Sequence, residues 1–221
     1  MRRLLTAALF VAACGFGVAA APAFQSANEI ATQVQARYDR IRDFSADFTQ
    51  EAVSGVLRKK LVERGTVVVK KPGKMRWTYK APEEKVFVSD GVQMFMHTPA
   101  DNQVIVSQVS AADQATTAVL FLSGKGNLTR DFTVSLLDGS PAGTYALKLQ
   151  PKLAERDYDW LQLVVDRSTY KIMGLTAADK QGTTSTFTFT NFKENVGAPD
   201  KTFEFVIPRG ADVIKAGSPG R

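Results

Sequence analysis

Hydrophobic and polar residues alternate with a period of two along most of the chain from Phe44 onward. This is the pattern of β-strands that bury one face. The first such stretch is Phe44–Thr49 and the last is Phe203–Ile207, and turn signals such as Asp90-Gly91 separate neighbouring stretches. Together they predict an antiparallel sheet of about eleven short strands that curls toward a barrel.

A helix is predicted before the first strand. Ser26 followed by Glu29 fits a capping box, in which each side chain bonds to the other residue's backbone N–H. The residues that follow form one apolar stripe at helical spacing: Ile30, Val34, Tyr38 and Ile41. The stripe indicates a helix that packs on the sheet.

A second helix is predicted at Ala111–Ser123, inside the β-rich part of the chain. Ser110 is a candidate N-cap and Gly124 a candidate C-terminal stop. The end of this helix contains Leu120 and Phe121 and is apolar on every side. A helix of this kind must be buried or must close over something apolar.

The first 23 residues have the pattern of a signal peptide. Arg2 and Arg3 precede an apolar stretch, and Ala21-Pro22-Ala23 offers the small residues that a signal peptidase needs. The folded protein is then one domain of residues 24–215, with a disordered tail at 216–221. In a competing interpretation, Val11-Ala12-Ala13-Cys14 is a lipobox and Cys14 becomes a lipidated N-terminus.

Composition excludes several classes of protein. Of the 221 residues, 44% are hydrophobic and 23% are charged, which is typical of a globular domain with a full core. His97 and Cys14 are single residues of their kind, so a multi-His or multi-Cys metal site is excluded and a His-based triad would depend on His97. Without Arg2 and Arg3, the chain has 26 basic and 22 acidic residues, and this excess of positive charge is too small for a nucleic-acid binder.

We therefore expect no enzyme, no catalytic residues, no metal and no cofactor. His97 stands beside a Thr-Pro turn, and no partner for a catalytic base is evident in the sequence. The basic cluster Arg58-Lys59-Lys60 is expected to be a solvated hairpin end, with docking to an acidic patch on a partner as the alternative.

Large apolar side chains indicate a function more strongly than any candidate catalytic or metal-binding residue does. Met75, Trp77 and Tyr79 share one face of a predicted strand, and Met94 and Met96 share a face of another. Methionine is flexible and polarizable, which suits an irregular apolar guest. The same five residues also fit an ordinary core, and alternation alone does not decide between core and cavity.

Four segments, in order, make the chain similar to the outer-membrane lipoprotein carrier protein family (LolA). They are Phe44-Ser45-Ala46-Asp47-Phe48-Thr49-Gln50, Lys70-Lys71-Pro72-Gly73-Lys74-Met75-Arg76-Trp77, Val88-Ser89-Asp90-Gly91 and Phe203-Glu204-Phe205-Val206-Ile207-Pro208-Arg209-Gly210. The resemblance extends over roughly Asn28 to Ile214.

The resemblance implies an unclosed antiparallel β-barrel with a helical lid over an apolar cavity. It further implies a monomeric periplasmic carrier, which takes lipoproteins by their acyl chains from an inner-membrane ABC-type exporter to an outer-membrane receptor. The residues expected to line the cavity are Phe48, Met75, Trp77, Tyr79, Val88, Met94, Met96, Leu120 and Phe121.

Lys71 marks a departure from the family. The resemblance implies an arginine just before the proline, which hydrogen-bonds to the lid when the cavity is empty, and Lys71 occupies that position. Lysine is a point charge on a flexible stem, whereas arginine is a rigid fork of donors. We therefore expect Lys71 to be a looser lid latch.

Two other functions stay open at this point. One is a membrane-anchored acceptor of the same fold, which requires lipidation at Cys14. The other is a sensor or glycolipid-binding domain that does not deliver lipoproteins.

Overall fold

One twelve-stranded sheet forms most of the computed structural model, which describes residues 25–109, 126–155 and 158–216. The predicted helix Ala111–Ser123, the segment 1–23 and residues 217–221 lie outside these ranges. The strands are β1 (Asp43–Val53), β2 (Lys60–Lys70), β3 (Lys74–Ala81), β4 (Lys85–Asp90), β5 (Gln93–Thr98), β6 (Gln103–Gln108), β7 (Phe132–Leu137), β8 (Thr144–Pro151), β9 (Trp160–Asp166), β10 (Ile172–Ala178), β11 (Thr184–Glu194) and β12 (Asp212–Lys215).

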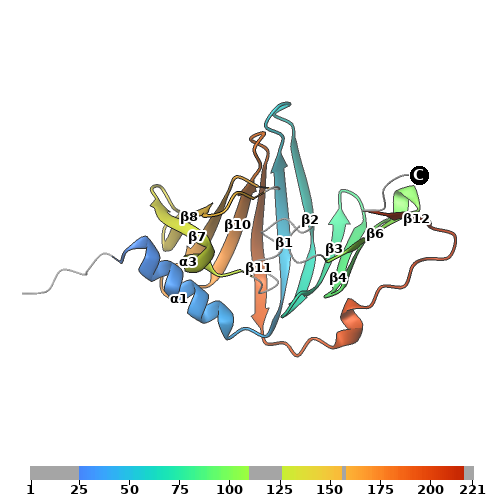
Figure 1. Ribbon diagram of the computed structural model, residues 1–221, viewed down its shortest axis with the longest axis horizontal. Coiled ribbons are helices and arrows are strands. Elements are labelled where there is room, and N and C mark those ends of the chain that lie inside the picture. Colours follow the sequence, from blue (N-terminus) through green and yellow to red (C-terminus); the bar gives the residue numbers. More distant parts are fainter. Residues whose placement is uncertain (1–24, 110–125, 156–157, 217–221) are drawn as a thin grey trace, which may run out of the picture.

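The sheet is open, as the family resemblance implied. Its strand order is β12-β6-β5-β4-β3-β2-β1-β11-β10-β9-β8-β7, so β12 and β7 are the two edges. Figure 1 shows the sheet curling between these edges without closing. The long strands β1, β2 and β11 form its middle, and β1 joins the two halves by pairing with β2 on one side and β11 on the other.

Eleven strands pair antiparallel, as expected, and a twelfth was not predicted. β12 lies parallel to β6. The predicted last strand, Phe203–Ile207, is wrong, because Asp200–Phe203 is a short 3-10 helix (η2) and residues 204–208 pair with no strand. These residues lie on the sheet rather than in it. Phe203 is buried and Phe205 half-buried, whereas Glu204 and Val206 are exposed, so the first part of the segment alternates as a strand does, which explains the error.

Helix α1 (Ala27–Asp39) begins at the predicted capping box. The Ser26 Oγ accepts from the Glu29 N–H at 3.3 Å, and the Ser26 N–H donates to the Glu29 carboxylate at 2.7 Å. The predicted stripe is buried together with core residues of the sheet, but only Ile30, Val34 and Tyr38 lie on α1, and Ile41 follows its end. The buried Gln35 accepts a hydrogen bond from the Leu128 N–H at 2.9 Å, which ties α1 to the short helix α3 (Leu128–Asp131).

The face of the sheet that α1 covers carries the main apolar core, and we call it the inner face. The opposite, outer face is covered over β3 and β4 by the C-terminal segment 198–211, which we call the strap (Figure 1). Lys70 and Lys74 hold Asp200 at 2.6 and 3.2 Å, and the Phe205 ring stacks on Phe95 with centroids 5.3 Å apart. The strap then leads into β12, which pairs with the edge of β6.

Candidate functional site

Five aromatic side chains meet on the inner face. The Trp77 ring lies 5.0 Å from Phe48 and 5.3 Å from Phe187, centroid to centroid, and Phe48 lies 4.9 Å from Tyr79. Phe189 extends the group at 6.4 Å from Trp77. Most of the pairs are edge-to-face or tilted, which aromatic quadrupoles favour. The middle of the inner face therefore holds a buried group of aromatic rings, which we call the aromatic cluster.

A glycine makes room for this cluster. A Cβ atom at Gly65 would lie 2.9 Å from the Phe48 ring and 2.1 Å from the Thr78 carbonyl oxygen. Real Cβ atoms do not approach other heavy atoms so closely, so any larger residue would displace the ring or the neighbouring strand. Gly65, which is opposite Phe48 on the neighbouring strand, therefore leaves room for that ring.

The strand register decides which predicted residues share the inner face. Trp77 is opposite Phe87, which is opposite Met96, and Met75 is opposite Ser89, which is opposite Met94. Because cross-strand partners point to the same side, the three methionines lie on the face of Trp77. Met75 and Met94 are buried, and Met96 is 40% exposed.

Val88 does not share that face. It is opposite Arg76 on one neighbour and Phe95 on the other, and all three point outward under the strap. Its place among the expected cavity residues is therefore corrected. Both faces of β4 are covered, so both parities of the strand are apolar and alternation could not separate them. Leu120 and Phe121 lie outside the described residues.

The inner face becomes polar toward the hairpin that joins β1 and β2. The buried Glu63 pairs with Lys85 at 2.6 Å, and the Tyr79 hydroxyl donates to Gln50 at 2.9 Å. Gln50 in turn donates to the Ser185 hydroxyl at 2.8 Å. Burial, with a smaller contribution from the Glu63 charge, raises the pKa of Tyr79, so its hydroxyl is a hydrogen-bond donor at neutral pH. The cluster is thus apolar on the α1 side and bounded by satisfied polar groups on the other.

One polar atom inside the aromatic cluster is unsatisfied. The Trp77 Nε1 is buried and has no hydrogen-bond partner among the described residues. Buried indole N–H groups usually find an acceptor. The cluster therefore contains a free donor in an otherwise apolar surface.

Lys71 connects the turn between β2 and β3 to the end of α1. Its Nζ donates to the Tyr38 carbonyl oxygen and lies 4.0 Å from the centroid of the Tyr38 ring. Burial lowers the pKa of Lys71, and the nearby Asp39 carboxylate partly opposes that effect. The helix that Lys71 contacts in the described residues is therefore α1. The predicted second helix, Ala111–Ser123, lies outside these residues.

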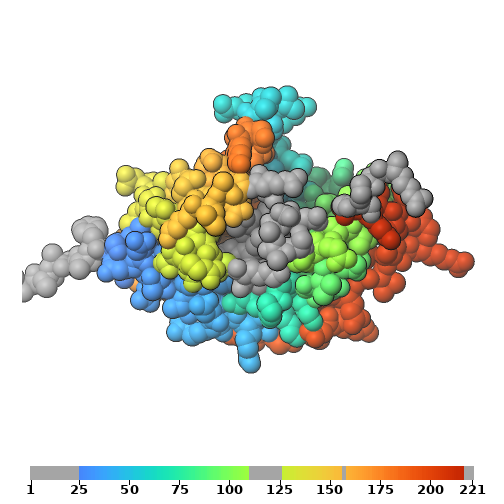
Figure 2. Space-filling model, viewed as in Figure 1, coloured from blue at the N-terminus to red at the C-terminus, as the bar shows by residue number. Residues whose placement is uncertain are grey.

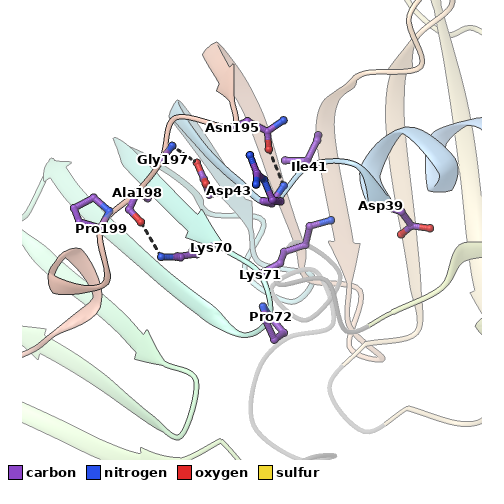
Figure 3. A pocket seen from close by; sticks show the side chains of 11 residues that line it. Asp39, Ile41, Asp43, Lys70, Lys71, Pro72, Asn195, Gly197, Ala198 and Pro199 are labelled. Carbon is purple, nitrogen blue, oxygen red and sulfur yellow. Dashed lines mark hydrogen bonds between the residues drawn. The ribbon is translucent and has the colours of Figure 1, made fainter.

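Lys71 also lines an open pocket of about 760 Å³ at the foot of the sheet (Figure 3). The pocket is formed by Asp39, Ile41, Arg42, Asp43, Lys70, Lys71, Pro72, Asn195, Gly197, Ala198 and Pro199. Its polar groups are largely used: Asn195 accepts from the Arg42 N–H at 2.8 Å, and Lys70 donates to the Ala198 carbonyl at 3.0 Å. This surface organises the end of α1 and the start of the strap and is not an apolar site.

Phe187 and Phe189 are inner-face residues that the sequence analysis did not select. They alternate with threonines along β11 (Thr186-Phe187-Thr188-Phe189), so period-two alternation could have found them. What the sequence could not show is that β11 pairs with β1, which brings Phe189 opposite Phe48.

No group of three His, Cys, Asp or Glu side chains in residues 25–109, 126–155 and 158–216 could hold a metal ion. His97 lies 5.8 Å from the Phe205 ring under the strap. None of the helices in these ranges combines the length and apolarity needed to cross a membrane.

The fold and the site together define a β-rich protein whose open, curved sheet presents a buried aromatic inner face. The chain belongs to the LolA family: the profile described as "Outer membrane lipoprotein carrier protein LolA" matches residues 39–206. This confirms the family that the four sequence segments indicated.

Individual relatives agree with that assignment. The chain is 31% identical over 173 residues to the outer-membrane lipoprotein carrier protein of Dechloromonas aromatica, covering 78% of this chain and 81% of the relative. It is also 31% identical to that of Legionella pneumophila strain Corby, covering 82% and 88%. A solved structure of an uncharacterized conserved protein from Thermus thermophilus has the same fold, with a TM-score of 0.53, 14% identity, and coverage of 86% of this chain and 99% of that one.

Proposed function

We propose that this protein is a periplasmic carrier that binds the acyl chains of lipoproteins on the inner face of its open sheet. The carrier role is taken from the names of its relatives, and the aromatic cluster is the observation that supports it here. Burying a methylene group is worth about 0.8 kcal/mol, so several acyl chains do not cross water without a cover. The route proposed is from an inner-membrane ABC-type exporter to an outer-membrane receptor, by a monomeric carrier.

Flexible side chains at the edge of the cluster suit this task. A carrier must release its cargo without fuel of its own, which favours an adaptable surface over a rigid one. Met75, Met94 and Met96 provide such a surface beside the aromatic rings. In this proposal Lys71 holds the last turn of α1 against the sheet in the empty state, and this contact breaks on loading.

The test uses spheroplasts of the native host and purified protein that starts at Phe24. If the protein is a carrier, newly made lipoproteins appear in the detergent-free supernatant as a one-to-one complex with it. The absence of release, with the protein folded, contradicts the proposal. It would instead favour a lipidated acceptor, for which the intact mass of the chain at Cys14 is the next measurement, or a lipid-binding sensor.

A matched pair of variants connects release to the inner face. Met96 and Met173 are 40% and 38% exposed, so a glutamate at either position is similarly exposed to solvent. Met96 lies on the Trp77 face, whereas Met173 lies at the bulge of β10 in the other half of the sheet. Met96→Glu is expected to reduce release at least several-fold, and Met173→Glu is expected to leave it unchanged.

A further inference from the structure

The connection between β1 and β2 stands out from the rest of the described surface. β2 continues beyond its pairing with β3, because Arg64 is opposite the last residue of β3, and Lys60 lies four residues further on. At about 3.3 Å per residue, the end of the hairpin extends roughly 13 Å past β3. Figure 2 shows this hairpin end protruding, with the β10–β11 turn beside it.

The end of this hairpin, residues 54–60, has a defined shape. The Ser54 N–H donates to the Lys59 carbonyl at 2.9 Å, and the Arg58 N–H donates to the Ser54 carbonyl at 3.0 Å. Gly55 packs so closely on the β10–β11 turn that a Cβ there would lie 2.2 Å from the Gln181 carbonyl oxygen. The hairpin end is therefore braced by a second hairpin and presents its side chains in a fixed arrangement.

Two large apolar side chains occupy the apex. Val56 is 79% exposed and Leu57 is 68% exposed, so neither side chain is part of the core. Two side chains are too few for a stable protein–protein interface, which buries well over a thousand square ångströms. They suffice to enter the boundary between lipid headgroups and acyl chains, where only a shallow apolar contact is needed.

Basic side chains surround this apex. Arg58 and Lys59 are exposed on the hairpin, and Lys180 is exposed on the bracing turn. Two acidic groups lie nearby: Glu51, which pairs with Lys60 at 2.6 Å, and Asp179, which accepts the Thr183 N–H at 2.8 Å and keeps its negative charge. Arg58, Lys59, Lys60 and Lys180 still outnumber these two carboxylates by two. The charge left over is positive, as recognition of an anionic phospholipid surface requires.

We propose that the β1–β2 hairpin end is a membrane-docking element, in which Val56 and Leu57 enter a bilayer surface while Arg58, Lys59 and Lys180 contact anionic headgroups. Two short apolar side chains and three charges give a weak, reversible attachment rather than an anchor. Such contact holds the protein at a bilayer briefly and independently of whether the aromatic cluster is filled.

The first test is co-sedimentation of the chain starting at Phe24 with vesicles of phosphatidylethanolamine and phosphatidylglycerol, compared with vesicles of phosphatidylcholine alone. Binding is expected only to the anionic vesicles and is expected to weaken as salt is added. The double variant Val56→Ser/Leu57→Ser is expected to lower the partition coefficient about tenfold. Leu153→Ser is the matched control, because Leu153 is 80% exposed in the β8–β9 connection.

Charge is tested separately. Lys59→Ser is expected to reduce binding about fivefold, since one basic residue near an anionic surface contributes about that factor. Lys201→Ser removes another exposed lysine, in η2, and is expected to change nothing.

A dye on the apex provides direct evidence of insertion. The chain from Phe24 has no cysteine, so Leu57→Cys accepts a single environment-sensitive fluorophore. Its emission is expected to shift to the blue and rise when anionic vesicles are added.

If the unmodified protein does not bind anionic vesicles, or if the apex variants bind as it does, the proposal is wrong, and an acidic protein surface becomes the candidate ligand. Loss of docking with lipoprotein release intact would leave the carrier proposal standing.

Discussion

Lys71 shows how one residue connects two parts of the fold. Its ammonium group reaches a carbonyl in the last turn of α1 and lies on the Tyr38 ring, and it is half-buried there. A cation near the C-terminal end of a helix is also favoured by the helix dipole. The contact is made by a single flexible side chain, in contrast to the rigid fork that an arginine would offer.

Replacing Lys71 tests this contact. Lys71→Leu is expected to lower the free energy of unfolding by about 1–2 kcal/mol, because the hydrogen bond and the cation–π contact are both lost. Lys71→Arg keeps both kinds of contact and is expected to stay within about 0.5 kcal/mol of the wild type. Urea titrations measure the difference. If neither variant changes lipoprotein pickup or release, Lys71 is not a latch.

Asp166 gives a pH-dependent prediction. Hydrogen bonds from Ser168 and Thr169 lower the pKa of Asp166 to about 2. A depressed carboxyl pKa adds stability above its unfolded value, near 3.8, and this stability is lost as pH falls through the folded value. Asp166→Ala is therefore expected to have a lower urea midpoint than the wild type at neutral pH. The difference should shrink between about pH 4 and about pH 2; a gap independent of pH would contradict this account.

Sequence alternation located the inner face correctly on β3, and also on β5 although Phe95 makes the opposite parity of that strand apolar as well. Met75, Trp77 and Tyr79 are flanked by polar residues, so only one parity of that strand was apolar. It failed on β4, where Phe87 and Val88 are adjacent and both faces are covered. The unsatisfied Trp77 N–H could not be inferred from sequence at all, since it depends on which strands become neighbours.

Among the elements, α1 was the most predictable and the strap the least. The capping box and the stripe of α1 are local signals; the capping box is confirmed, and so is the stripe as far as Tyr38, where the helix ends one residue later. The strap has no local signal that distinguishes it from a strand. Its position depends on contacts with Lys70, Arg76 and Phe95, which lie more than one hundred residues earlier in the chain.

The capping box at Ser26 should be measurable. Ser26→Ala removes the acceptor for the Glu29 N–H and is expected to lower the free energy of unfolding by about 1 kcal/mol. Ser26→Asp keeps an acceptor at the N-cap and is expected to be near neutral. Equal loss in both variants would show that the hydroxyl acts in some way other than capping.

The strap should stabilise the fold through Phe203. This ring is 1% exposed, so Phe203→Ala is expected to lower the free energy of unfolding by about 3 kcal/mol. Val206 is 85% exposed in the same segment, and Val206→Ala is expected to stay within about 0.5 kcal/mol. Similar values for the two variants would mean that the strap lies on the sheet without stabilising it.

At the scale of the whole molecule, an open sheet has two edges that must be protected. β12 covers the edge of β6, and β7 is left as a short outer strand. An uncovered edge with free N–H and C=O groups can pair with a second molecule. Ending the chain at Ala211 removes β12 and is expected to cause concentration-dependent self-association in sedimentation velocity. Removing only residues 217–221 is the control, and a truncated protein that stays monomeric would show that β12 does not protect this edge.

The central place of β1 has a consequence for how the protein is made. β1 is the first strand to leave the ribosome, yet its partner β11 is among the last, and Asp47 meets Asn191 across 144 residues of chain. At about 5–20 residues per second, synthesis of the intervening chain takes on the order of ten seconds. Throughout that time one side of β1 is unpaired, and the two halves of the sheet cannot join. The nascent chain therefore passes through a vulnerable interval in which a holding chaperone would do most to prevent aggregation.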